Sequence, residues 1–156
     1  MRAAIDFKLR DTASVRMHKL RSFDLHVVPS LSPEIVILET GTNDLPNCKP
    51  EVVGSAIEDL VVLILGQFSV RVVGVCQVIP RGQTHADSEF FDRSRILNQY
   101  LEVVSLTFWQ HSAFSHPSKL FYLPGGVHLN PQGQYLLYRS YRGAILYAVT
   151  YFKGGT

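Results

Sequence analysis

Two polar segments of this sequence carry side chains that could take part in chemistry. In the stretch IVILETGTNDLPN, Asn43 and Asp44 follow Gly41 where an apolar run ends. An asparagine amide in such a place can donate a hydrogen bond to a developing oxyanion. In the stretch GGVHLNPQG, His128 supplies the side-chain type best suited to proton transfer near neutral pH. Each signal alone is more typical of a turn or of a surface histidine, so the surrounding elements decide whether the two meet.

Four segments have the composition of β-strands. Residues 34 to 39 and residues 69 to 80 are mainly apolar and rich in β-branched side chains, which is typical of strands covered on both faces. The segment from Ile5 to Leu9 alternates apolar and charged residues, which is the period of a half-exposed strand. Residues 106 to 109 are predicted to form a further short strand.

Three helices are predicted from apolar residues that recur at three- and four-residue spacing. Pro50 opens the first helix, and Asn130 caps the last one, which begins at Pro131. The second runs from about residue 88 to residue 104. The expected buried stripes are Val53, Ile57, Leu60, Val61 and Ile64 in the first helix, Phe90, Leu97, Leu101 and Val104 in the second, and Leu137, Tyr138, Tyr141, Ile145 and Ala148 in the last.

The order of these elements predicts a parallel α/β sheet with helices on its faces. Such sheets bind ligands at the carboxyl ends of their strands. The turn with Asn43 lies at such an end, and His128 lies in a loop that could reach the same rim. With 156 residues and 46% hydrophobic content, the chain is expected to form a single domain over residues 1 to 156.

Composition and charge argue against several other classes of protein. The formal net charge of +2 gives no strong nucleic-acid signal. The longest apolar stretch, residues 61 to 65, is too short to span a membrane, and the N-terminus lacks the apolar core of a signal peptide. Cys48 in a polar loop and Cys76 in a buried run form no disulfide framework. A cytoplasmic or otherwise intracellular protein is expected, and its oligomeric state is left open.

Neither a metal site nor a cofactor is expected from the motifs. The histidines other than His128 lack a ligand spacing such as His-Glu-x-x-His, and a metal site needs three or four converging ligands. A glycine-rich phosphate loop is also absent from the sequence. These other histidines stand at positions 18, 26, 85, 111 and 116.

Two stretches resemble a known family, the SGNH or GDSL-type hydrolases. GTND (41 to 44) resembles the third sequence block of that family, and GGVHLNPQGQYLLY (125 to 138) resembles its histidine block. The two blocks occur in the expected order, and the resemblance covers roughly residues 15 to 150. The chain is also similar to animal esterase-like domains associated with retrotransposon open reading frames. The resemblance implies a three-layer α/β/α fold around a parallel sheet of flavodoxin-like order.

The resemblance also implies a reaction and a role for each matching residue. The family hydrolyses acyl esters with a serine nucleophile, a histidine base and an aspartate that orients the histidine. On this pattern His128 is the base and Asn43 is a donor to the oxyanion. Gly41 permits the close turn that exposes Asn43, and Asp44 braces the loop by accepting hydrogen bonds from backbone amides. An ester is the implied substrate, and its acyl group is left open.

The sequence departs from the family at the residues that drive the reaction. The Gly-Asp-Ser of the first block is absent, so the nucleophile is unknown, and Gly125 stands where the orienting aspartate is expected. The stretch RDTASVR (10 to 16) offers no clear counterpart of the second block. Ser14 lacks a neighbouring glycine for a sharp turn and is better interpreted as a hydroxyl at a helix start. Neither cysteine is a good substitute, because Cys76 is expected in the core and Cys48 has no evident base.

Two functions therefore remain open from the sequence. The first is ester hydrolysis by the family mechanism, which we expect to be inactive in this chain because the nucleophile and the orienting aspartate are missing. The second is a non-catalytic binding or scaffold domain, either a pseudoenzyme or a truncated gene product. The missing block also concerns the sheet, since its strand lies between two others in the family. Without it, the neighbouring strands have to pair directly or leave buried backbone groups unpaired, and the segment from Ile5 to Leu9 is the candidate to fill the gap.

Overall fold

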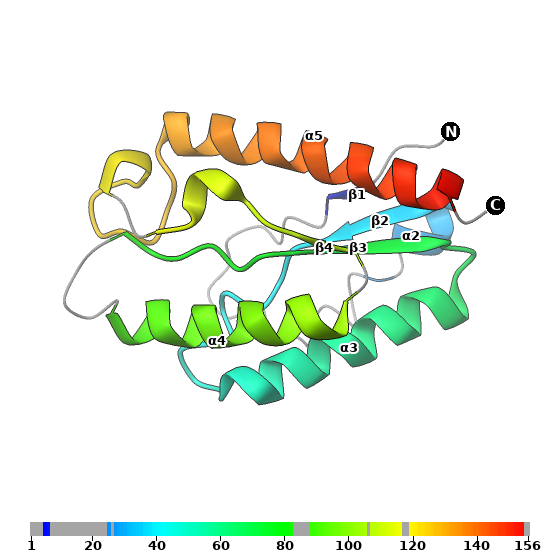
Figure 1. Cartoon of the computed structure of the whole chain (residues 1–156), viewed down its shortest axis with the longest axis horizontal. Coiled ribbons are helices and arrows are strands. Elements are labelled where there is room, and N and C mark those ends of the chain that lie inside the picture. The colour runs from blue at the N-terminus through cyan, green and yellow to red at the C-terminus, as the bar shows by residue number, and fades with distance from the viewer. Residues whose placement is uncertain are drawn as a thin grey trace.

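The computed structural model describes residues 5 and 6, 25, 27 to 82, 88 to 105, 107 to 116 and 119 to 154. Its elements form three layers, with a sheet between one long helix and a pair of helices (Figure 1). The predictions for Ser14 and for the stretch 10 to 16 lie outside the described residues.

The described part of the sheet is parallel and has the strand order β1-β2-β3-β4. The predicted strands are confirmed, and the two central strands are shorter than their apolar runs, because only the paired residues count as strand. The strands are β1 (Ile5–Asp6), β2 (Ile35–Leu38), β3 (Val72–Cys76) and β4 (Phe108–Trp109). Strands in chain order match the 1-3-4-5 part of the flavodoxin-like order 2-1-3-4-5.

The N-terminal segment joins this sheet. Ile5 pairs with Val36 and Asp6 pairs with Ile37. The segment from Ile5 to Leu9 therefore pairs beside β2 through the two residues described, and that it fills a gap between two strands stays a prediction. The backbone of β2 is consequently paired on both sides, with β1 and with β3.

The predicted helices are also confirmed. Helix α3 (Pro50–Gln67) begins at Pro50, α4 covers Ser88–Val104, and α5 covers Pro131–Gly154. Asn130 caps α5, because its Oδ1 atom accepts a 2.9 Å hydrogen bond from the Gly133 amide. The connections contain three shorter elements, namely α2 (Val27–Leu31), η3 (Ser112–Phe114) and η4 (Lys119–Phe121).

Alternate side chains of the strands face opposite layers. In β2, Val36 and Leu38 pack in the core formed with α3 and α4, whereas Ile35 and Ile37 pack under α5. In β3, Val73 and Val75 face the α3 and α4 side, and Val72 and Cys76 face α5. Both central strands are fully buried, which explains their continuous apolar composition.

Two predicted core positions are wrong. Tyr138 was expected in the buried stripe of α5, but it is 69% exposed, and Ala144 is buried in that stripe instead. Val104 was expected on the buried face of α4, but it is 41% exposed at the end of that helix. In both cases the 3.6-residue period was right, but the width of the covered face was overestimated.

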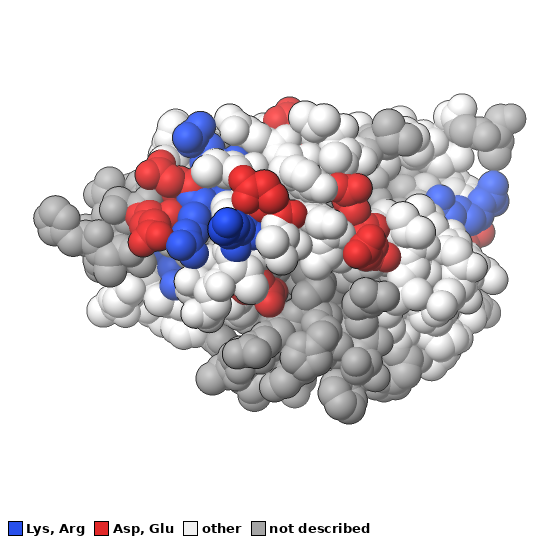
Figure 2. Space-filling model, turned by 90° about the horizontal axis from the view of Figure 1, so that it is seen from below, with Lys and Arg blue, Asp and Glu red and all other residues white. Residues whose placement is uncertain are grey.

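The surface on the α3 and α4 side carries acidic and basic side chains close together (Figure 2). One such pair on α4 is Arg93 and Glu89, whose side chains are 2.8 Å apart. This face therefore shows no continuous basic stripe among the residues described. Within the same residues, none of the helices combines the length and the apolar character that crossing a membrane requires.

Candidate functional site

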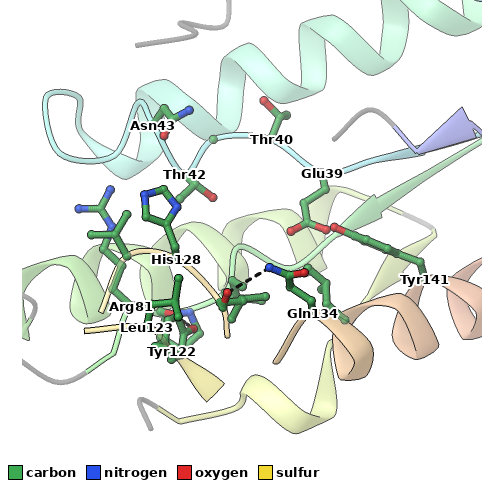
Figure 3. Close-up of a pocket in the computed structure, with 16 residues that line it drawn as sticks. Glu39, Thr40, Thr42, Asn43, Arg81, Tyr122, Leu123, His128, Gln134 and Tyr141 are labelled. Atoms are coloured by element: carbon green, nitrogen blue, oxygen red, sulfur yellow. Dashed lines mark hydrogen bonds between the residues drawn. The ribbon is translucent and has the colours of Figure 1, made fainter. Parts of the chain in front are cut away.

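A cavity of about 380 Å³ opens at the carboxyl ends of the parallel strands. Its walls come from residues 39 to 43 after β2, residues 79 to 81 after β3, the loop that holds His128, and the first turns of α5. Asn43 and His128 both line it, although both side chains are largely exposed to solvent. Figure 3 shows their side chains on the same side of the cavity.

Gly41 shapes the turn that presents Asn43. Its φ angle is +104°, a conformation that side-chain-bearing residues rarely adopt, and a Cβ atom there would lie 3.2 Å from Val53 Cγ1. The amides of Asp44 and Leu45 each donate a 3.1 Å hydrogen bond to the Gly41 carbonyl. The turn expected from the sequence is thus held by its own backbone. That the Asp44 carboxylate braces the loop stays a prediction.

Arg93 fastens the same loop to helix α4. Its Nη1 atom donates a 2.7 Å hydrogen bond to the Leu45 carbonyl and a weaker one, 3.2 Å long, to the Pro46 carbonyl. Leu45 itself is fully buried in the core. The loop that carries Asn43 is therefore anchored at both its start and its end.

A tight turn positions His128. Tyr122 and Leu129 form an antiparallel bridge, and the Leu123 amide donates a 2.8 Å hydrogen bond to the His128 carbonyl. Two contacts join this turn to the loop after β3. The Gly82 amide donates a 2.7 Å hydrogen bond to the Gly126 carbonyl, and the buried Tyr122 hydroxyl donates to the Pro80 carbonyl.

The turn around His128 is also joined to α5. The Asn130 amide donates to the Phe121 carbonyl at 2.9 Å, and Asn130 Nδ2 donates to the Leu120 carbonyl at 2.7 Å. Gln134 lines the cavity one turn further along, and its side-chain amide donates a 3.2 Å hydrogen bond to the Leu129 carbonyl (Figure 3). The sequence pattern that predicted an Asn130 cap thus also explains why His128 reaches the cavity.

Arg81 is a charged residue of this cavity that the sequence motifs did not indicate. It follows β3, and its guanidinium lies 4.2 Å above the centre of the Phe90 ring. Figure 3 shows it beside His128, whereas Glu39 and Tyr141 lie together at the other end of the cavity. Its position after a central parallel strand was the signal that could have pointed to it.

Gly125 stands at the position where the family resemblance expects the aspartate that orients His128. Its φ angle is +96°, and a Cβ atom there would meet open space. Among the described residues that line the cavity there is no serine and no cysteine. The hydroxyl side chains in these walls are those of Thr40, Thr42, Tyr122 and Tyr141.

A second group of polar side chains lies at the Glu39 end of the cavity. Potential metal ligand atoms of Glu39, Cys76 and His111 lie within 4.8 Å of one another. The sequence motifs predicted no metal site, and they do not indicate this group because its members lie at the ends of three different strands. Cys76 is buried, as predicted, and His111 is fully buried as well.

Solved structures of two hydrolases are similar to this chain. A GDSL-like lipase from Bacteroides thetaiotaomicron matches with a TM-score of 0.60 and 18% identity, over 83% of this chain and 68% of the lipase chain. An acetylxylan esterase from Geobacillus stearothermophilus also matches with a TM-score of 0.60 and 18% identity, over 83% of this chain and 67% of the esterase chain. No protein-family model matches the sequence, and no curated protein matches it. The chain therefore has an SGNH or GDSL hydrolase-like fold.

Proposed function

We propose that the cavity binds acyl esters in the manner of an SGNH hydrolase, and that the serine mechanism of hydrolysis is lost or strongly reduced in this chain. The observation that carries the proposal is the meeting of Asn43 and His128 at one cavity, with Gly125 at the position of the orienting aspartate. The likeness of the fold to a GDSL-like lipase and to an acetylxylan esterase supports an ester as the class of ligand.

The polar groups of the cavity suit the carbonyl end of an ester. The Asn43 amide can donate to a carbonyl oxygen, and the Arg81 guanidinium adds positive charge near His128 (Figure 3). Apolar side chains, among them Leu137 and Val127, can contact the acyl or alcohol group. A cavity of about 380 Å³ has room for a short-chain ester.

The same geometry explains why turnover is expected to be weak. A serine hydroxyl attacks efficiently only when an oriented base removes its proton. Gly125 has no side chain that could orient His128. Loss of the orienting aspartate alone lowers the rate of a serine protease by about 10⁴-fold. The groups that bind the ester can therefore remain in place. The rate of hydrolysis then falls to the residual level that these groups support without an oriented base.

Binding is tested by saturation-transfer NMR with ethyl butyrate as the ligand. We expect the purified chain to transfer saturation to this ester, and Asn43→Ala and His128→Ala to weaken the transfer. Asn47→Ala is the matched control, since Asn47 is exposed in the same loop and does not line the cavity. Equal transfer in all variants, or none in the folded wild type, would refute an ester-binding cavity and leave a scaffold domain as the better explanation.

Turnover is tested with 4-nitrophenyl acetate, with fluorophosphonate treatment followed by mass spectrometry. We expect a rate close to that of the buffer and no phosphonylated residue. His116→Ala provides a control for the loss of an exposed histidine away from the cavity. Hydrolysis that disappears in His128→Ala but not in His116→Ala, together with a single phosphonylated serine, would show that the chain is an active esterase.

A further inference from the structure

Three neighbouring strands each deliver one potential metal ligand to the same side of the sheet. Glu39 follows β2, Cys76 ends β3, and His111 follows β4 by two residues. Cys76 packs with the α5 layer, and Tyr141 of α5 stacks edge-on against the His111 ring, with 5.5 Å between ring centres. The strand pairing thus brings together donors that are far apart in sequence.

The His111 ring is held with one nitrogen turned toward the cluster. Its side chain is 0% exposed, and its Nδ1 atom is hydrogen-bonded to Ser140 Oγ at 2.7 Å. Trp109 fixes that hydroxyl in turn, since its Nε1 atom donates to Ser140 Oγ at 3.0 Å. A histidine bound through its other ring nitrogen is the usual arrangement of a metal ligand, because the second contact sets the orientation of the ring.

The Nε2 atom of His111 lies within ion-pair distance of a carboxylate oxygen but forms no hydrogen bond to it. Nε2 and Glu39 Oε2 are 3.4 Å apart, and within the described part of the chain neither atom has a hydrogen-bond partner. A buried polar atom without a hydrogen bond lowers the stability of a protein, so two such atoms side by side point to a group bound between them. A tetrahedral zinc ion with bonds of about 2.0 to 2.1 Å holds its nitrogen and oxygen ligands roughly 3.3 Å apart. The observed separation of 3.4 Å therefore fits an ion between the two atoms.

The chemistry and charge of the three side chains also fit such an ion. Thiolate and imidazole are preferred ligands of zinc and similar transition metals, whereas calcium and magnesium prefer oxygen alone. A thiolate and a carboxylate together balance a divalent charge, which matters at a site where His111 and Cys76 are almost fully buried. The Cys76 sulfur lies within 4.8 Å of the His111 nitrogen and the Glu39 oxygen. To share a tetrahedral ion with them, it has to move to roughly 3.5 Å from each of these atoms.

We propose that Glu39, Cys76 and His111 bind a zinc ion, or a transition-metal ion of similar preference, at the inner end of the cavity. Binding releases the proton of the Cys76 thiol to solvent, because the thiolate is the ligand form. Three protein ligands leave one tetrahedral position for water. Glu39 and Tyr141 both line the cavity, so the proposed site adjoins it. The site does not depend on whether the cavity binds esters.

Cobalt provides the direct test, because a thiolate bound to Co²⁺ gives an intense charge-transfer absorption in the near ultraviolet. We expect the reduced wild-type chain to bind one equivalent of Co²⁺ with this absorption, and to lose the signal when Zn²⁺ is added. The spectrum needs no variant and thus does not depend on the folding of any mutant. A folded wild-type chain that shows no thiolate absorption at saturating Co²⁺ would overturn the proposal.

Variants then identify the ligands. Cys76→Ser should abolish the thiolate absorption, whereas Cys48→Ser, which changes the other cysteine, should leave it intact. Glu39→Gln should weaken zinc binding in calorimetry, and Ser140→Ala should weaken it about 10- to 100-fold by releasing the His111 ring. Absorption that persists in Cys76→Ser, or that vanishes in Cys48→Ser, would contradict this set of ligands.

Discussion

Gly41 determines where the amide of Asn43 is presented. Gly41→Ala should lower the free energy of unfolding by about 1 to 3 kcal/mol, because the strained φ angle of +104° is combined with close contacts to Val53 and Ile57. Gly125→Ala is the matched comparison, since its φ angle of +96° is similar but its Cβ atom would meet nothing. Urea unfolding should therefore show the larger loss in Gly41→Ala, and equal losses would mean that the contacts do not matter.

Tyr122 should make the protein sensitive to alkaline pH. Burial raises the pKa of its phenol above the usual value near 10. The contribution of the neutral Tyr122 phenol to the free energy of unfolding is therefore fully present below about pH 10. It is lost as the pH rises from there toward the pKa in the folded state, at up to about 1.4 kcal/mol per pH unit. Tyr122→Phe should flatten this loss, although losing the hydrogen bond to Pro80 costs about 0.5 to 1.5 kcal/mol at neutral pH.

The measurement is urea unfolding at a series of pH values from 7 upward. Tyr138→Phe serves as the control, because Tyr138 is exposed on α5 and its replacement should leave the alkaline slope unchanged. A slope in Tyr122→Phe that equals the wild-type slope would show that another group controls alkaline unfolding.

At the level of single residues, the sequence predicted the site residues that belong to a motif. It did not predict those that only the folding of the chain brings to the site. Asn43 and His128 were singled out from their local stretches, and both line the cavity. Arg81 carries no motif, and His111 was set aside because it has no ligand spacing. Their positions depend on which strands are neighbours and on which side of the sheet each strand end faces, and that information is not contained in local spacing.

Helices α3 and α4 pack closely because α3 has a glycine at their contact. A Cβ atom on Gly54 would lie 2.4 Å from the ring of Tyr100, whereas one on Gly66 would meet nothing. Gly54→Ala should therefore destabilise the protein by about 1 to 3 kcal/mol through overpacking. Gly66→Ala in the same helix should stabilise it by about 0.5 to 1 kcal/mol, because alanine loses less conformational freedom than glycine.

Thermal and urea unfolding of these two variants measure the sign of each effect. Opposite signs within one helix would separate the packing contact from helix propensity. If Gly54→Ala proved as stable as the wild type, the Tyr100 ring would have moved aside, and the close packing of α3 on α4 would not be required.

At the level of elements, the helices were easier to predict than the connection before α5. The proline signal correctly placed the start of α3 at Pro50, and the asparagine signal correctly placed the cap of α5 at Asn130. The connection before α5 contains η3, η4 and the start of the turn that holds His128, none of which was predicted. Those features depend on contacts with Gly82 and Pro80, which a local pattern does not reveal.

The whole molecule is predicted to have low stability. The outer strand β4 has only two residues, Phe108 and Trp109, and residues 107 and 110 on either side lie outside the strand, so its ladder contributes few hydrogen bonds. We expect a free energy of unfolding near the lower end of the range for natural domains, about 5 kcal/mol. Urea unfolding and calorimetry give this value. A sharp thermal transition with a high midpoint would contradict it.

The fold class was predictable because strand and helix signals alternate along the whole chain, and this order alone favours a parallel sheet with helices on both faces. The chemistry of the site was less predictable. The cavity draws on four segments between Glu39 and Tyr141, and one of them, residues 79 to 81, carries no pattern that resembles a known family.

During synthesis, β2, β3 and β4 leave the ribosome before α5, because α5 follows them in sequence. Until α5 emerges, Ile35, Ile37 and Val72 lack the helix that covers them in the finished protein. Exposed apolar surface makes an incomplete chain prone to aggregate. The yield of this protein in a cell should therefore depend on how soon α5 follows the strands, and a pause in translation just before Pro131 should increase the aggregated share.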